Sequence, residues 1–316
     1  MLNVFLTSDV EVWCNTLNDH SFSNSYNLHI LGRVKEGDFG LPYQMKVMND
    51  YGIKGVFFVE PLFASVYGID PLANITGLVE EYGHETQLHI HAEWVKRNLD
   101  LLAYTPENIG RQVFNYSLKN QESLISKGIE YMNKVGAGKM NAFRAGNFGA
   151  NNDTLVALEK NHISIDSSVN PARSSSKIDL GRTIYQREKI GGVVEYPMTV
   201  FEDYPGHLRH AQICACSTQE MKNILYKAVE AGWDSFVILS HSFELIDRTK
   251  GRVNKVVDKR FKELCRFLGE NKDLFNCVGF NDVLNDEISD CQPQKHLSSN
   301  IVFTGKRMVE QLISNW

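Results

Sequence analysis

The sequence contains few cysteines, and they form no pattern that binds zinc or builds a disulfide framework. The 316 residues include six cysteines, at positions 14, 214, 216, 265, 277 and 291. No two are spaced as a Cys-x-x-Cys pair, which would indicate a zinc or redox site. Cys214 and Cys216 alternate as strand residues do, and we interpret them as strand cysteines rather than as a thiol site. We therefore expect reduced cysteines, as is typical of a cytoplasmic protein.

The sequence also lacks an excess of basic residues and any long apolar segment. Lysine and arginine number 33 against 38 aspartate and glutamate residues, which gives a net charge of −5 and an isoelectric point near 6.1. This balance does not supply the basic surface that nucleic acids and anionic membranes require, and it disfavours strongly anionic polymers. No segment reaches the roughly 18 apolar residues of a membrane span, and residues 1–6 lack the basic region of a signal peptide. We expect a cytoplasmic protein with no nucleic-acid or membrane partner, and the oligomeric state stays open.

Hydrophobic residues make up 43% of the chain and alternate between strand-like and helix-like segments. The predicted strands cover residues 3–12, 54–60, 88–91, 139–143, 162–165, 236–239 and 277–280, and the predicted helices cover residues 42–51, 71–82, 106–134, 152–160, 218–231 and 254–268. This order predicts an α/β fold with a parallel sheet and crossover helices. Short β-like pieces broken by Gly, Pro and Ser predict an insertion at about 171–209 that covers one end of the domain. We predict one domain over residues 1–290 and a C-terminal tail over residues 291–316.

Two predicted strand ends carry pairs of metal-binding side chains. In residues 88–91, His89 and His91 alternate with apolar residues, and Asp9 and Glu11 have the same i, i+2 spacing. Residues i and i+2 of a strand point to the same face, so each pair projects side by side. Imidazole and carboxylate groups are ligands of divalent metals such as Zn²⁺. We predict that His89 and either Glu11 or Asp9 bind one divalent metal ion, with His91 as a further ligand.

Three other polar residues also follow predicted strands. Arg144, Asp166 and His241 each come at the carboxyl end of an apolar run. In α/β proteins this is the end of the sheet where active sites are built. We therefore expect these side chains to lie near the predicted metal ligands.

Taken in order, these strand ends resemble the five motifs of the polysaccharide deacetylases of carbohydrate esterase family 4, the chitooligosaccharide-deacetylase homology group. The segments that carry the resemblance are Thr7-Ser8-Asp9-Val10-Glu11, Gly83-His84-Glu85 with His89, Phe143-Arg144-Ala145-Gly146, Asp166-Ser167-Ser168 and Ile238-Leu239-Ser240-His241-Ser242. The resemblance covers roughly residues 2–285. It implies a distorted (β/α)₇ barrel and metal-dependent removal of an N-acetyl or O-acetyl group.

The resemblance also implies a role for each catalytic candidate. Asp9 corresponds to the catalytic base, Glu11 to a metal-binding carboxylate, Arg144 to the residue that steadies the base, and His241 to the general acid. We expect Arg144 to lie beside Asp9 and keep it ionised, and Asp166 to lie beside His241 and favour the imidazolium.

Two positions depart from the family pattern. The family's first motif has adjacent aspartates, whereas Val10 separates the two carboxylates of this chain. The second motif usually spaces its histidines four apart, but the residue four positions after His89 is Glu93. The third metal ligand therefore stays open between His91 and Glu93.

The expected activity is removal of an acetyl group from an N-acetylated sugar or a sugar-containing glycan precursor. The expected ion is Zn²⁺, with Co²⁺ and Ni²⁺ as alternatives, because such an ion activates water and polarises a carbonyl. We interpret four aromatic residues near the predicted insertion as packing residues rather than sugar-stacking ones: Tyr185, Tyr196, Phe201 and Tyr204. Two other functions stay open, a catalytically inactive sugar-binding relative and a hydrolase of small non-sugar amides.

Overall fold

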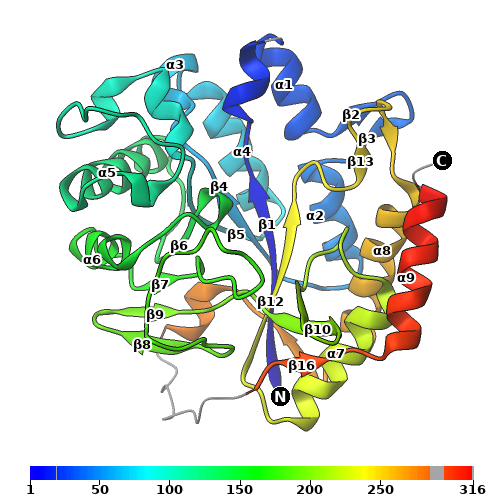
Figure 1. Cartoon of the computed structure of the whole chain (residues 1–316). Helices are drawn as coiled ribbons and strands as arrows, with labels where there is room; N and C mark the ends of the chain where they lie inside the picture. The colour runs from blue at the N-terminus through cyan, green and yellow to red at the C-terminus, as the bar shows by residue number, and fades with distance from the viewer. Residues whose placement is uncertain (19, 285–294, 315–316) are drawn as a thin grey trace.

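The predicted alternation of strands and helices produces one curled, largely parallel sheet (Figure 1). The computed structural model of the protein describes residues 1–18, 20–284 and 295–314. The strands of the sheet are β1 (Leu2–Val10), β4 (Gly55–Val59), β5 (Glu85–Ile90), β6 (Ala142–Ala145), β7 (Ile165–Asp166), β8 (Glu188–Ile190), β9 (Val193–Glu195), β12 (Ser235–His241) and β15 (Phe275–Cys277). Their order is β12-β1-β4-β5-β6-β7-β9-β8, with β15 paired to the start of β1. Only β8 and β9 pair in the antiparallel direction within this described sheet.

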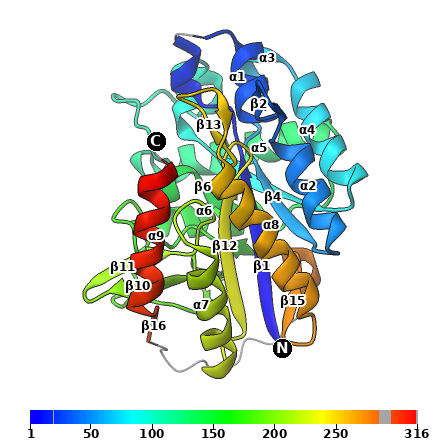
Figure 2. The same ribbon diagram turned by 90° about the vertical axis from the view of Figure 1, so that its right-hand side faces the viewer.

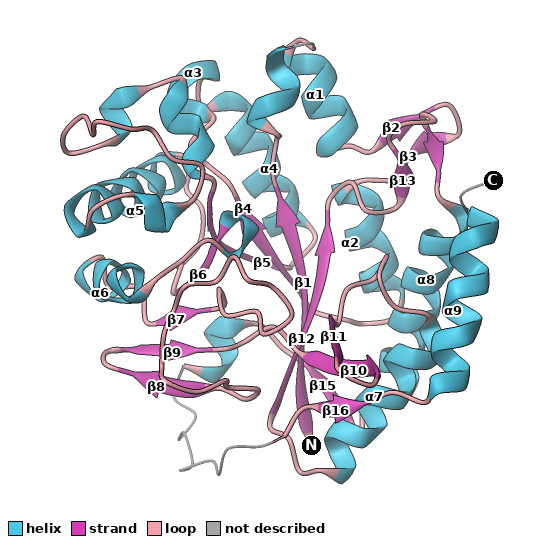
Figure 3. Cartoon of the chain, in the orientation of Figure 1, coloured by secondary structure: helices cyan, strands magenta, loops and turns pink. Residues whose placement is uncertain are grey.

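Helices cover the outer side of the sheet (Figure 3). They are α1 (Phe22–His29), α2 (Leu41–Asp50), α3 (Ala64–Tyr67), α4 (Asp70–Glu81), α5 (Leu118–Lys134), α6 (Asn152–Lys160), α7 (Thr218–Glu230), α8 (Lys255–Glu270) and α9 (Ile301–Ser314). Helices α7, α8 and α9 pack against one another on the side of β12 (Figure 2). Over the described residues, no helix has the length and apolar character that crossing a membrane requires.

Alternation along the strands creates two apolar layers. On β1, Val4 and Leu6 belong to the large cluster that includes the helices, whereas Phe5 belongs to a second cluster in the barrel interior. Phe5 stacks there on Phe280, with ring centroids 4.5 Å apart. Because side chains alternate along a strand, the odd-numbered residues of β1 face the interior. The same alternation carries Asp9 to the interior at the carboxyl end of β1.

Residues 199–213 extend the curl beyond β12. The backbone N–H of Val237 donates to Thr199 Oγ1 at 2.9 Å, and that of Leu239 donates to the Ala211 carbonyl at 2.8 Å. The Ile213 N–H in turn donates to the Leu239 carbonyl at 3.1 Å. These bonds occupy the edge of β12 that would otherwise be open, as expected for a barrel that closes irregularly.

Several predicted element boundaries are wrong, among them those of one helix and of the C-terminal strand of the main sheet. The helix predicted over 106–134 begins only at Leu118, where Ser117 caps it by accepting a hydrogen bond from the Asn120 N–H at 3.4 Å. Before it lies a loop with a short 3₁₀ turn (Val113–Asn115). The strand predicted over 277–280 is β15 (Phe275–Cys277), and the apolar residues Val278 and Phe280 after it pack in the barrel interior.

The segment 171–209, predicted to be an insertion, contributes to the main sheet as well as to a small one. Strands β8 and β9 extend the main sheet next to β7. Strands β10 (Val200–Tyr204), β11 (His207–His210) and β16 (Leu297–Ser298) form a separate three-stranded sheet. Two further short pairs are β2 (Arg33–Val34) with β3 (Gly37–Asp38), and β13 (Ile246–Asp247) with β14 (Arg252–Val253).

The described part of the C-terminal tail packs on the domain through a buried ion-pair cluster. Arg307 of α9 donates from Nη2 to Asp203 Oδ2 at 2.7 Å and from Nε to Glu220 Oε1 at 3.0 Å. All three side chains are at most 2% exposed. The predicted boundary between residues 290 and 291 lies outside the described residues.

Candidate active site

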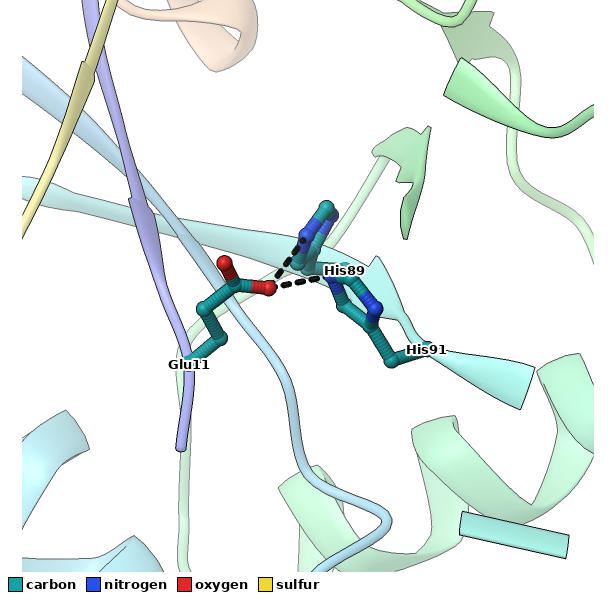
Figure 4. A group of neighbouring side chains, drawn as sticks. All are labelled: Glu11, His89 and His91. Carbon is teal, nitrogen blue, oxygen red and sulfur yellow. Dashed lines mark ion pairs between the residues drawn. The ribbon is translucent and has the colours of Figure 1, made fainter. Parts of the chain in front are cut away.

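Three of the predicted metal ligands converge at the carboxyl ends of β1 and β5. Glu11 Oε2 lies 3.5 Å from His89 Nε2 and contacts His91 Nε2 (Figure 4). Glu11, His89 and His91 each offer one ligand atom, and these atoms lie within 4.8 Å of one another. Glu11 and His89 are buried, and the His91 side chain is 12% exposed. A candidate Glu–His–His metal site is therefore present.

The outer atoms of these three side chains are fixed by hydrogen bonds. His89 Nδ1 lies 2.8 Å from the Arg144 carbonyl, and His91 Nδ1 lies 2.8 Å from Glu93 Oε2. Each contact favours a proton on Nδ1, which leaves the Nε2 lone pair directed at the site. Trp13 Nε1 donates to Glu11 Oε1 at 2.7 Å, while Glu11 Oε2 is buried without a hydrogen-bond donor in ordinary geometry. This donor set fits a divalent metal ion.

The electrostatics of the group favour positive charge. Burial alone would raise the pKa of the Glu11 carboxyl, but the neighbouring imidazoles outweigh it and hold that pKa well below its usual value. Burial alone would lower the pKa of His91, but Glu11 and Glu93 outweigh it and raise that pKa well above its usual value. A divalent cation bound to these side chains would supply the positive charge that the imidazole protons otherwise supply.

The segment after β6 makes room for the His91 ring. A Cβ atom at Gly146 would lie 2.7 Å from Cγ and Nδ1 of His91, so any larger residue would displace the ring. The next two residues, Asn147 and Phe148, have φ of 54° and 58°. Such left-handed backbone is costly for residues other than glycine and concentrates at functional sites. The glycine of the third segment therefore has a specific steric role.

Asp9 is held by Arg144, as the sequence predicts. Arg144 Nη1 donates to Asp9 Oδ1 at 2.7 Å and to Thr7 Oγ1 at 2.9 Å. The guanidinium also lies over the Phe58 ring, 4.2 Å from its centroid, and is fully buried. Asp9 Oδ2 lies 3.9 Å from His89 Nε2 on the side of the metal candidates. One oxygen of Asp9 is thus fixed by Arg144, and the other faces the site.

The predicted pairing of Asp166 with His241 is wrong, because the carboxylate that contacts His241 is Glu244. His241 Nδ1 lies 2.7 Å from Glu244 Oε2. Burial alone would lower the pKa of His241, but the hydrogen bond and charge of Glu244 outweigh it and raise that pKa to about 9. Glu244 is fixed in turn by the Cys214 N–H at 2.9 Å and by Gln212 Nε2 at 3.1 Å. His241 is also the register partner of Asp9, on the neighbouring strand.

Asp166 lies deeper in the barrel, beside a second acidic residue. Its Oδ1 accepts a hydrogen bond from Ser168 Oγ at 2.6 Å, and burial raises the pKa of its carboxyl. Burial and the proximity of Asp166 raise the pKa of Glu195 well above its usual value. Both shifts favour the protonated form of the carboxyl, and Asp166 is not among the residues that line the cavity described next.

The site opens into two adjoining cavities. One, of about 270 Å³, is lined by five predicted site residues: Asp9, Glu11, His89, His91 and His241. The other, of about 430 Å³, shares Glu11, His91, Asn147 and His241 with the first. Neither cavity is lined by any of the four aromatic residues that we interpreted as packing residues.

Glu244 and Trp13 contact predicted site residues, but the sequence reasoning did not find them. Glu244 follows His241 by three residues, and its backbone N–H donates to the His241 carbonyl at 3.0 Å in a tight turn. Trp13 follows Glu11 by two residues and is 36% exposed. Their short spacing from predicted residues was the only available signal, and such spacing is common in loops.

Solved structures provide the comparison with known proteins. A scan against protein-family models and a search among curated proteins gave no match. A protein from Mycobacterium smegmatis that has been assigned as a polysaccharide deacetylase has a TM-score of 0.56 at 13% identity, over 89% of this chain and 88% of that chain. A 4-alpha-glucanotransferase from Thermococcus litoralis has a TM-score of 0.51 at 11% identity, over 95% of this chain and 40% of that chain. A family 4 carbohydrate esterase from Streptomyces lividans, solved with acetate, has a TM-score of 0.40 at 11% identity, over 86% of this chain and 90% of that chain.

At these identities the likeness concerns the fold. The match to the M. smegmatis protein extends over most of both chains, as the resemblance of the five sequence segments requires. The structure thus confirms for this chain the distorted α/β barrel of the polysaccharide deacetylase type.

Proposed function

We propose that the protein is a metal-dependent hydrolase that removes the acetyl group from an N-acetylated sugar or a sugar-containing glycan precursor. The observation that carries the proposal is the convergence of Glu11, His89 and His91 with Asp9 and His241 around one cavity. Amide hydrolysis needs an activated water, a base for its proton and an acid for the leaving nitrogen, and these residue types can supply all three. The fold shared with the M. smegmatis protein supports the same reading.

We assign Glu11, His89 and His91 as the metal ligands and Glu93 as the residue that orients His91. The contact between Glu93 and His91 Nδ1 supports this assignment, because it places the carboxylate on the outer side of the ring. Two imidazoles and one carboxylate are a usual ligand set for catalytic Zn²⁺. When bound, such an ion would lower the pKa of water and polarise the acyl carbonyl.

The remaining residues divide the proton transfers between them. Asp9 accepts a proton from water as the water oxygen bonds to the acyl carbon, and the hydrogen bond from Arg144 holds Asp9 in position for this task. His241 donates its proton to the amide nitrogen as the carbon–nitrogen bond breaks, which releases acetate and the free amine. Glu244 favours the protonated imidazole that a general acid needs.

The test incubates the Zn²⁺-loaded protein with N-acetylglucosamine conjugates, from which acetate release is measured, and in parallel with allantoin, a small non-sugar amide, whose ring-opening hydrolysis is measured. Asp9→Asn should lower the rate by about 10² to 10⁴ while the protein keeps its metal and its fold. Asp50→Asn, on an exposed position of α2, is the matched control and should leave the rate unchanged. Turnover of allantoin alone would contradict the carbohydrate assignment. A folded protein with neither metal nor turnover would instead indicate an inactive sugar-binding relative.

A further inference from the structure

The two adjoining cavities form one cleft that passes the candidate metal site. They share Glu11, His91, Asn147 and His241, so two of the three metal candidates line both cavities. Arg173 lines only the first cavity, and Arg111 lines only the second. The cleft therefore has an arginine on each side of the candidate catalytic residues.

Neither arginine has a carboxylate partner among the described residues. Both side chains are exposed, and no ion pair joins them to an acid in the part of the chain that the structure describes. The acidic residues that line the cleft are already engaged: Asp9 with Arg144, Glu11 with the two imidazoles and Glu93 with His91. The charge of each arginine is thus available to a bound molecule.

Arg173 is the better placed of the two to contact a substrate at the reacting centre. The cavity that it lines also contains Asp9, His89 and His241, whereas the cavity of Arg111 lacks Asp9 and His89. Arg173 lies on a turn fixed by buried Asn170, whose carbonyl accepts from the Arg173 N–H at 2.9 Å and whose Oδ1 accepts from the Ala172 N–H at 3.1 Å. The backbone thus holds this arginine at the rim of the cavity.

Apart from Arg173 and the candidate catalytic and metal-binding residues, the polar groups that line this cavity are uncharged donors and acceptors. They include Ser175, His210 and Gln212, and His210 Nε2 lies 2.6 Å from Gln212 Oε1. Burial lowers the pKa of His210 and outweighs the hydrogen bond with Gln212, which acts in the opposite direction. The nearby charge of Arg173 lowers this pKa further, so the neutral ring is favoured. This side of the cleft therefore presents one cation among neutral polar groups, a combination suited to a sugar hydroxyl array with a single anionic group.

We propose that the substrate is an N-acetylated sugar that carries an anionic group, a carboxylate or a phosphate, and that Arg173 binds this group. The proposal rests on the proposed deacetylase function and specifies its substrate class. The protein's net charge of −5 repels long polyanions, but one local arginine can still select a substrate with a single anion. Arg173 is then a specificity-determining residue that leaves the chemistry at the acetyl group unchanged.

The experiment compares deacetylation of three substrates by the Zn²⁺-loaded protein: N-acetylglucosamine, N-acetylglucosamine 1-phosphate, and a disaccharide of N-acetylglucosamine and glucuronic acid. At least one anionic substrate should have a kcat/KM about 10-fold or more above that of the neutral sugar, since a charge-assisted hydrogen bond is worth about that factor. Arg173→Gln should remove this preference through a higher KM and leave the neutral sugar within about twofold. Arg266→Gln, which removes an exposed arginine of α8, is the control and should change nothing.

The phosphate and glucuronate arms distinguish the two sources of the anion. Three results would overturn the proposal. The first is equal kcat/KM for neutral and anionic substrates, and the second is an equal loss of kcat/KM on all substrates in Arg173→Gln. The third is a preference for the anionic substrate that is lost only in Arg111→Gln. If no substrate turns over, the affinities of glucosamine 1-phosphate and glucosamine are compared by calorimetry. This measurement tests anion binding by Arg173 independently of the proposed activity. Tighter binding of the phosphate that disappears in Arg173→Gln supports the inference, and binding that survives in this variant shows that the anion contacts another group.

Discussion

The contact between Glu93 and His91 leads to a prediction about metal affinity. Glu93 Oε2 lies 2.8 Å from His91 Nδ1, and the two side chains are 13% and 12% exposed. Replacing Glu93 by Gln removes the charge but keeps a group that can accept the same proton. Carboxylates that orient a ligating imidazole typically change metal affinity 10- to 100-fold, which corresponds to about 1.4 to 2.8 kcal/mol. We expect Glu93→Gln to weaken Zn²⁺ binding within this range and His91→Ala to weaken it much further.

The assay is competition for Zn²⁺ between the metal-free protein and a chromophoric chelator. Glu107→Gln, an exposed acid in the loop before α5, is the matched control and should bind Zn²⁺ as the wild type does. An unchanged affinity in Glu93→Gln would refute the orienting role. Full binding in His91→Ala together with loss of binding in Glu93→Ala would move the ligand to Glu93, the alternative that the sequence leaves open.

Three further predictions concern the acid, the glycine and the tail. In His241→Ala the protein should keep its metal and its fold while the rate falls by about 10² to 10⁴. Glu244→Gln should lower the pKa of His241 and so move the alkaline loss of kcat/KM to lower pH. An unchanged pH profile would exclude an effect of Glu244 on His241. Gly146→Ala should weaken Zn²⁺ binding with little change in unfolding free energy, because the new Cβ displaces the His91 ring; unchanged affinity would show that the ring can shift. Arg307→Gln should lower the free energy of unfolding measured in urea by about 3 to 5 kcal/mol. The control Lys306→Gln, at the exposed neighbouring position, should leave this free energy unchanged, and equal effects of the two variants would contradict a stabilising ion-pair cluster.

The positions of several barrel strands along the chain could be predicted because these strands contain buried apolar runs. Strand β4 is buried along its whole length, as are most residues of β1 and β12. Such runs stand out from the amphipathic helices between them. The prediction of a helix over 106–134 was wrong in its first part. Apolar residues before Leu118 have near-helical spacing, but they lie in a loop that ends at the Ser117 cap.

The partner of His241 could not be predicted because it depends on backbone geometry beyond the strand. Asp166 is a carboxylate at the end of a predicted strand, but its strand β7 is separated from β12 by four strands in the sheet. Glu244 reaches His241 only because the chain turns immediately after β12. A sequence pattern predicts which strand ends meet at one edge, whereas the pairing of side chains there depends on turns that the pattern does not encode.

The two departures from the family pattern follow one geometric rule in this structure. Val10 and Ile90, the residues between the paired acids and between the paired imidazoles, both belong to the outer apolar cluster. Their neighbours on either side must therefore face the barrel interior, so that Asp9, Glu11 and His89 all reach the site. The i, i+2 spacing of the acids is thus consistent with the i, i+2 spacing of the imidazoles, and the two departures produce one site together.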